Sequence, residues 1–99
     1  MQPEREVLEK TRPATKPPDL YKVILHNDDY TTMEFVVEVL EQIFHKSPAE
    51  AFRIMMHVHT QGRGLCGAYP YEVAETKVDT VHDRARHRGF PLRASLEQE

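Results

Sequence analysis

The sequence predicts one small α+β domain, in which three strands and three helices follow one another in the order β-α-α-β-α-β. Short runs rich in β-branched and aromatic residues predict the strands, and apolar residues at helical spacing after clear start signals predict the helices. With 99 residues, the chain has room for one small core and a tail. We therefore expect a single three-stranded antiparallel sheet packed against the three helices.

The N-terminal segment differs from the rest of the chain in composition. Residues 1–18 hold four of the seven prolines and alternate in charge, and their apolar residues show no clear period. Such a composition is typical of an extended, flexible arm. We expect a flexible N-terminal extension over residues 1–18 and the core domain over residues 19–99.

The first strand and the first helix are predicted from adjoining patterns. The segment from Leu20 to His26 contains the apolar run Val-Ile-Leu, which is typical of a strand. Thr31 and Glu34 then match the Thr-x-x-Glu capping box, in which the threonine side chain caps the start of a helix. The apolar residues that follow predict a helix from about Thr32 to His45.

A second start signal predicts the second helix. Ser47 is placed to cap it, Pro48 occupies the first helical position, and Glu50 completes the capping box. The helix is expected to run to about Thr60 and to stop before Gly62.

Glycines and apolar residues define the last three elements. Gly62, Gly64 and Gly67 bracket a short turn and a predicted strand from Leu65 to Tyr69. The third helix is expected to start near Pro70, to run to about Arg88 and to end at Gly89. Alternating apolar residues then predict a last strand from Phe90 to Leu96.

The composition also excludes several classes of function. A net charge of −3 argues against a general binder of nucleic acids or membranes. Cys66 is the only cysteine, so no internal disulfide can form, and the N-terminus lacks the apolar core of a signal peptide. We therefore expect a cytoplasmic protein. The six histidines and the cysteine do not approach the spacing of a zinc site, so we expect neither a metal nor a cofactor.

The turn between the first strand and the first helix is unusually rich in hydrogen-bond acceptors. Asn27, Asp28 and Asp29 stand there in a row, before the expected cap. These residue types often satisfy their own backbone in a turn. Alternatively, two adjacent carboxylates beyond what the cap needs indicate that a cation binds here. Acid–base hydrolysis with His59 is disfavoured, because no Ser or Cys nucleophile stands in a recognisable motif, and we expect no enzyme.

Seven segments carry a resemblance to a known family. They are Lys16-Pro17-Pro18, Tyr21-Lys22-Val23-Ile24-Leu25, Asn27-Asp28-Asp29-Tyr30-Thr31, Met33-Glu34-Phe35-Val36, Val58-His59, Cys66-Gly67 and Val73-Ala74-Glu75-Thr76-Lys77. Together with the intervening chain they cover roughly residues 16–97 in unbroken order. On these segments the sequence resembles the ClpS family, the adaptors of the bacterial N-degron pathway.

The resemblance implies both a function and a set of site residues. ClpS proteins hold a protein whose first residue is Leu, Phe, Tyr or Trp and deliver it to a Clp AAA+ unfoldase of the ClpA or ClpC type. The positions that match contacts to the free α-amino group are Asn27, Asp28 and His59. The positions that match the side-chain pocket are Leu25, Asp29, Thr31, Met33, Val36, Met55, Val58 and Leu92. Glu72 and Lys77 match contacts to the N-terminal domain of the unfoldase.

A second hypothesis comes from a different class. The apolar stripe of the first helix is wider than one packing contact needs, so one flank could line a groove. A structural interaction domain would use such a groove to bind helices of a partner. The two hypotheses differ in one respect that is easily tested, because only an N-degron adaptor responds when the α-amine of the ligand is blocked.

Overall fold

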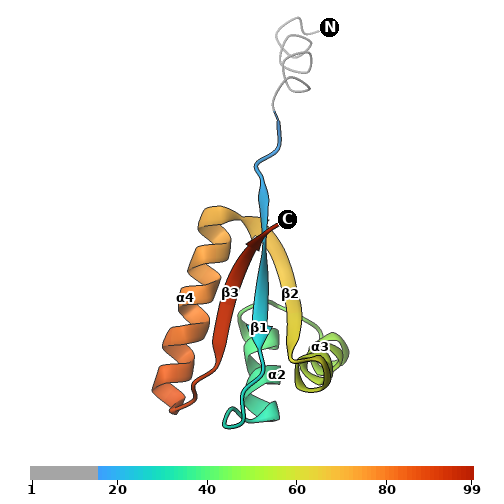
Figure 1. The fold of residues 1–99 in the computed structure, drawn as a ribbon, viewed down its shortest axis with the longest axis vertical. Helices are drawn as coiled ribbons and strands as arrows, with labels where there is room; N and C mark the ends of the chain where they lie inside the picture. Colours follow the sequence, from blue (N-terminus) through green and yellow to red (C-terminus); the bar gives the residue numbers. More distant parts are fainter. Residues whose placement is uncertain (1–15) are drawn as a thin grey trace, which may run out of the picture.

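The computed structural model describes residues 16–99, which form a three-stranded sheet and three helices (Figure 1). The elements are β1 (Leu20–His26), α2 (Met33–Gln42), α3 (Pro48–Gln61), β2 (Arg63–Pro70), α4 (Tyr71–Arg88) and β3 (Arg93–Gln98). The sheet is antiparallel with β1 in the centre, in the order β2-β1-β3. The predicted α+β class and element order are confirmed. Residues 1–15 lie outside the described part, so the flexible extension stays a prediction.

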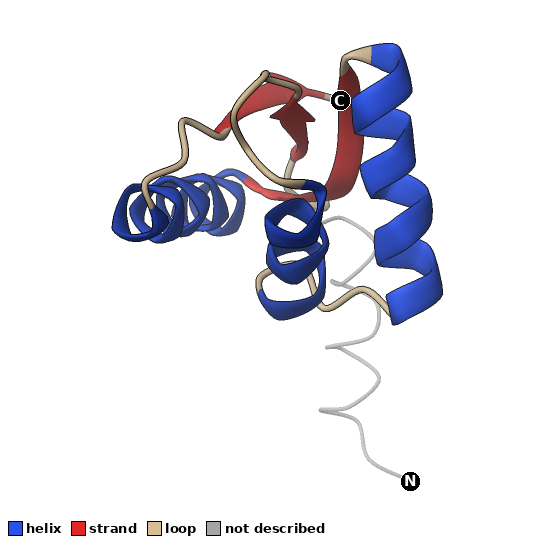
Figure 2. Ribbon diagram, turned by 90° about the horizontal axis from the view of Figure 1, so that it is seen from below, coloured by secondary structure: helices blue, strands red, loops and turns tan. Residues whose placement is uncertain are grey.

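One face of the sheet carries the core. Val23 and Leu25 of β1 are fully buried, and their partners on β3 are Leu96 and Ala94. The helices supply the other side of this core, which includes Phe35 of α2 and residues of α3 and α4. Both views place α2 between α4 and α3, so α3 lies toward the β2 side of the sheet (Figures 1 and 2). This arrangement brings the start of α2, the end of α3 and the β1–α2 turn together.

The β1–β2 pairing contains a β-bulge. Val23 pairs with Gly67 and Ile24 pairs with Leu65, so Cys66 is the extra residue of β2. The bulge turns the Cys66 side chain into the core, where it is fully buried, and leaves Leu65 49% exposed. Burial raises the pKa of the Cys66 thiol to about 12, so the sulfur is protonated at neutral pH.

Both ends of the first helix differ from the prediction. The cap of α2 is Thr32, whose side-chain oxygen accepts a hydrogen bond from the Phe35 amide at 3.1 Å. Thr31 was expected in that role, but its hydroxyl donates to Asp28 instead. The helix ends at Gln42 rather than near His45, whose φ of 55° is in the left-handed region.

The second helix follows its prediction closely. The Ser47 hydroxyl oxygen accepts from the Glu50 amide at 3.2 Å, and Pro48 occupies the first turn. Gly62 ends α3 in the left-handed conformation, with φ of 90°.

The other two strands differ from their predicted limits. β2 runs from Arg63 to Pro70, longer at both ends than expected, because Arg63 and Gly64 pair with β1 at one end and Pro70 pairs with Leu20 at the other. β3 begins at Arg93 rather than Phe90. The Phe90 amide closes the end of α4 by donating to the Ala85 carbonyl at 2.9 Å, so this part of the chain still belongs to the helix terminus.

Candidate functional site

The turn between β1 and α2 is held by its own side chains. One carboxylate oxygen of Asp28 accepts from the amides of Tyr30 and Thr31, at 2.8 and 2.7 Å, and the other accepts from the Thr31 hydroxyl at 2.7 Å. The backbone N–H of Asn27 donates to the backbone carbonyl of Gly62 at 2.9 Å, which connects the turn to the end of α3. The turn is therefore anchored at both of its sides.

The same hydrogen bonds keep Asp28 ionised. Partial burial acts to raise the pKa of this carboxyl, but the hydrogen bonds from Thr31 and Tyr30 outweigh it. The net result is a pKa below the ordinary value for aspartate. Within residues 16–99, neither Asp28 nor Asp29 forms an ion pair. The turn thus presents negative charge that no side chain of the described part neutralises.

Beside this turn lies a cavity of about 220 Å³ that opens to solvent, here named the turn cavity. The residues that line it are Asn27, Asp28, Asp29, Thr31, Met33, Val36, Met55, Val58 and His59. The polar lining comes from the turn and from His59 near the end of α3, and the apolar lining comes from α2 and α3. Met33 is 43% exposed, whereas Met55 is 4% exposed, so the first methionine stands nearer the surface.

This lining combines two chemical properties. Carboxylates, an amide oxygen and an imidazole can accept hydrogen bonds from a cation, and hydrogen bonds to charged groups are the strong ones. Methionine and valine walls remove an apolar side chain from water, and methionine adapts to different shapes. The turn cavity therefore suits a ligand that carries a positive charge next to an apolar group.

Comparison with known proteins assigns the family. The family model for the ATP-dependent Clp protease adaptor protein ClpS matches residues 16–95. The chain belongs to the ClpS family. It is 64% identical over 90 residues to the ATP-dependent Clp protease adapter protein ClpS of Maricaulis maris, covering 91% of this chain and 83% of the relative. The corresponding protein of Desulfatibacillum aliphaticivorans is 55% identical over 94 residues, covering 95% and 90%.

A solved structure of a ClpS protein is also similar. The structure of Agrobacterium tumefaciens ClpS2 bound to L-phenylalaninamide has a TM-score of 0.80 to this chain at 41% sequence identity. The match covers 84% of this chain and 100% of the solved chain. The described part of this ClpS chain is thus an adaptor domain of the Clp protease system.

Two of the residues predicted for the side-chain pocket lie elsewhere. Leu25 is fully buried in the core beneath the sheet and does not line the turn cavity. Leu92 is 3% exposed and borders another cavity, of about 250 Å³, together with Phe90 and Arg93. The other predicted amine and pocket residues all line the turn cavity, and the roles in binding of all these residues, Leu25 and Leu92 included, stay predictions.

The two residues predicted for the unfoldase interface have different surroundings. Glu72 is exposed in the first turn of α4. The Lys77 ammonium donates to the Ile43 carbonyl at 2.8 Å and lies 5.6 and 5.2 Å from the ring centres of Phe44 and Tyr69. Lys77 therefore caps the end of α2, a structural contact that the sequence did not predict. Its contact with an unfoldase stays a prediction.

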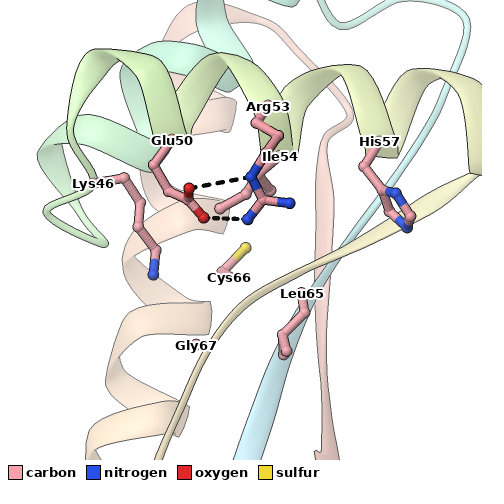
Figure 3. Close-up of a pocket in the computed structure, with 8 residues that line it drawn as sticks. All are labelled: Lys46, Glu50, Arg53, Ile54, His57, Leu65, Cys66 and Gly67. Atoms are coloured by element: carbon pink, nitrogen blue, oxygen red, sulfur yellow. Dashed lines mark hydrogen bonds and ion pairs between the residues drawn. The ribbon is translucent and has the colours of Figure 1, made fainter.

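Sequence reasoning also missed a second cavity, on the opposite side of α3. This space of about 310 Å³, here named the edge groove, is shown in Figure 3. Its lining residues are Lys46, Glu50, Arg53, Ile54, His57, Leu65, Cys66 and Gly67. No motif signals it, because it arises where α3 passes beside β2.

Two negative findings concern the described residues only. No helix in residues 16–99 is long and apolar enough to cross a membrane. The same part of the chain holds no group of three or more His, Cys, Asp or Glu side chains arranged to bind a metal.

Proposed function

We propose that this ClpS-family adaptor binds the free α-amino group and the large hydrophobic first residue of N-degron substrates, and delivers them to a Clp AAA+ unfoldase. The first residues it accepts are Leu, Phe, Tyr and Trp. The observation that carries the proposal is the turn cavity, where unneutralised carboxylates adjoin an apolar wall. A protein N-terminus with such a side chain is complementary to this lining, because it carries a positive charge next to an apolar group.

Recognition of the amine rests on the anchored turn. Asp28 has about four acceptor positions on its carboxylate, and three are used by Tyr30 and Thr31. The remaining position can accept from an ammonium without any movement of the turn. Asn27 and His59 supply further acceptors in the same lining.

Recognition of the side chain rests on α2 and α3. Met33 and Val36 face the cavity from one helix, and Met55 and Val58 from the other. The ligand of the Agrobacterium tumefaciens ClpS2 structure, L-phenylalaninamide, supports this assignment. It has a free α-amine and an aromatic side chain, and its amidated carboxyl resembles the first peptide bond of a substrate.

Delivery would use a different surface of the same domain. Glu72, exposed at the start of α4, is the residue we assign to the N-terminal domain of a ClpA-type or ClpC-type unfoldase. Lys77 adjoins this region, but its ammonium already binds the Ile43 carbonyl. A substitution of Glu72 is therefore the better probe of the interface.

We assign no catalytic step to the domain. The Cys66 thiol is buried and protonated, so it is not available as a nucleophile. Binding and release of an N-terminus need no such group.

Calorimetric titration with peptides tests the proposal. A Leu-first peptide with a free amine should bind at least about tenfold more tightly than the same peptide with an acetylated amine, since charge-assisted hydrogen bonds are lost. A Gly-first peptide is the control for the side chain and should also bind weakly. Equal affinity for the free and acetylated Leu-first peptides would contradict the proposal and favour a domain that binds partner helices.

A further inference from the structure

The edge groove lies between α3 and the strand at one edge of the sheet. β2 pairs with β1 on one side only, and no strand of the described residues covers its other side. Where the two elements cross, a Cβ on Gly64 would lie 2.6 Å from the Val58 side chain, so helix and strand touch there. The groove begins beyond this contact, along Leu65, Cys66 and Gly67 (Figure 3).

The strand side of the groove is suited to an extended chain. Edge strands present free backbone N–H and C=O groups, which can pair with an added strand, and the bulge at Cys66 limits such pairing to the residues on either side of it. Gly67 contributes no side chain, but the Tyr69 ring lies over it, and Leu65 is 49% exposed, so an incoming strand would meet these two side chains beside the strand edge. The Cys66 side chain is fully buried, so it offers no contact to such a strand.

The helix side of the groove is predominantly basic. Lys46, Arg53 and His57 line it, together with a single carboxylate, Glu50. The Glu50 carboxylate is already paired with the Arg53 guanidinium, with Nε to Oε1 at 3.1 Å (Figure 3). Lys46 forms no ion pair within residues 16–99. The groove therefore has an unpaired positive charge, in a chain whose net charge is −3.

We propose that the edge groove binds an extended acidic segment of a partner protein, which adds as a strand to the free edge of β2. The backbone of the segment pairs beside residues 65–67, and one of its carboxylates faces Lys46. Charge complementarity selects this occupant over a second copy of the chain. The β2 segment of a second copy contains no carboxylate that could face Lys46, and its one charged side chain, Arg63, is already paired with Glu97. The inference is independent of the proposed function of the turn cavity.

Nuclear magnetic resonance titration of the ¹⁵N-labelled full chain tests this inference. The probe is the peptide acetyl-Val-Glu-Val-Glu-Val-amide, which has no free amine for the turn cavity. We expect saturable shifts of the amides of residues 65–67 and of Lys46. The matched peptide acetyl-Val-Lys-Val-Lys-Val-amide should leave these amides unchanged.

Two charge reversals provide the matched variants. Lys46→Glu should weaken binding of the acidic peptide about tenfold, because one attraction becomes a repulsion. Lys16→Glu changes the net charge equally at an exposed site before β1 and should change affinity less than twofold. Lys46→Gln, which adds no negative charge, should weaken binding by about two- to fivefold.

Any of the following results would overturn the inference. One is the absence of shifts at residues 65–67 with the acidic peptide, or equal shifts with the lysine peptide. A second is the same set of shifts with inorganic phosphate, which would make the groove a simple anion site. A third is shifts confined to the turn cavity. The last is concentration-dependent broadening of residues 65–67 without peptide, which would identify a second copy as the occupant.

Discussion

The two sides of α3 face cavities of similar size and opposite charge. On one side Met55, Val58 and His59 face the turn cavity, of about 220 Å³, where the β1–α2 turn supplies two carboxylates. On the other side Arg53 and His57 face the edge groove, of about 310 Å³, where β2 supplies the unpaired edge of the sheet. The comparison shows that one helix can contribute to two sites. The charge of the turn cavity comes mainly from the segment opposite α3, whereas the charge of the edge groove comes from the helix side.

The largest expected effect is a difference in the free energy of unfolding between substitutions on the two sides of α3. Met55 is 4% exposed, so Met55→Ala should cost about 2–5 kcal/mol of the free energy of unfolding. Arg53→Ala removes only an exposed ion pair and should cost much less. Chemical denaturation of both variants measures the difference. Similar losses would show that the groove side is as tightly packed as the cavity side.

The same Met55→Ala variant should also change which peptides bind. The methionine side chain narrows the turn cavity, so the wild-type chain should bind Ile-first and Val-first peptides poorly, and the variant should accept them. Met33→Ala, at an exposed position of the same lining, provides the comparison with little loss of stability. The assignment is wrong if the wild-type chain binds Ile-first and Leu-first peptides equally well.

The next effect concerns peptide affinity, and it distinguishes the charge of Asp28 from the role of this residue in holding the turn. Asp28→Asn keeps an oxygen that can accept from the Tyr30 and Thr31 amides but removes the charge. Affinity for a Leu-first peptide should fall about tenfold, because the ammonium loses its charge-assisted bond. Glu50→Gln removes a carboxylate from the other side of α3 and should leave this affinity unchanged. Equal effects of the two substitutions would mean that only the net charge of the chain matters.

The smallest expected effect is a dependence of stability on pH. The pKa of Asp28 is lower in the folded chain than its ordinary value of 3.8, so the unfolded chain takes up the proton first as the pH falls. The stability that Asp28 contributes is therefore complete above that ordinary value and is lost as the pH drops through the folded pKa. The wild-type chain should lose this increment in acid, and Asp28→Asn should lack it.

The salt dependence of acid stability should also differ between Asp28 and Glu50. The pKa of Glu50 is also lowered, mainly by the hydrogen bond from Arg53, but this pair is exposed. About 1 M salt should therefore remove the contribution of Glu50 to acid stability and leave most of that of Asp28, whose donors belong to its own turn. Denaturation of Asp28→Asn and Glu50→Gln at pH 5 and pH 3, with and without salt, measures both. Equal sensitivity to salt would contradict the structural role assigned to Asp28.

The turn cavity was more predictable from the sequence than the edge groove for a physical reason. Most residues of its lining lie close together in the chain, between Asn27 and Val36, where local capping and turn rules apply. Even so, the choice of Thr32 over Thr31 as the cap depends on which hydroxyl Asp28 engages, and both threonines fit the pattern. The helical spacing of α3 predicted its apolar residues but not what would face them.

The edge groove and the Lys77 contact depend on tertiary structure alone. Lys77 and Ile43 are 34 residues apart, and no local rule joins a lysine to a carbonyl at that distance. Likewise, the groove exists because the sheet order makes β2 an edge strand and because a bulge shifts its register at Cys66. Strand order and register are set by the whole core, so a single sequence does not reveal them.

The most direct test of the account maps one peptide onto both sides of α3. The ¹⁵N-labelled chain is titrated with the free-amine peptide Leu-Ala-Gly-Ser-Ala-amide while amide shifts are recorded. We expect saturable shifts at residues 27–31 and at His59 and none at residues 65–67, and we expect the shifts at residues 27–31 and His59 to disappear when the peptide is acetylated. Shifts concentrated at residues 65–67, or equal shifts with the acetylated peptide, would contradict the claim that the turn cavity recognises a protein N-terminus.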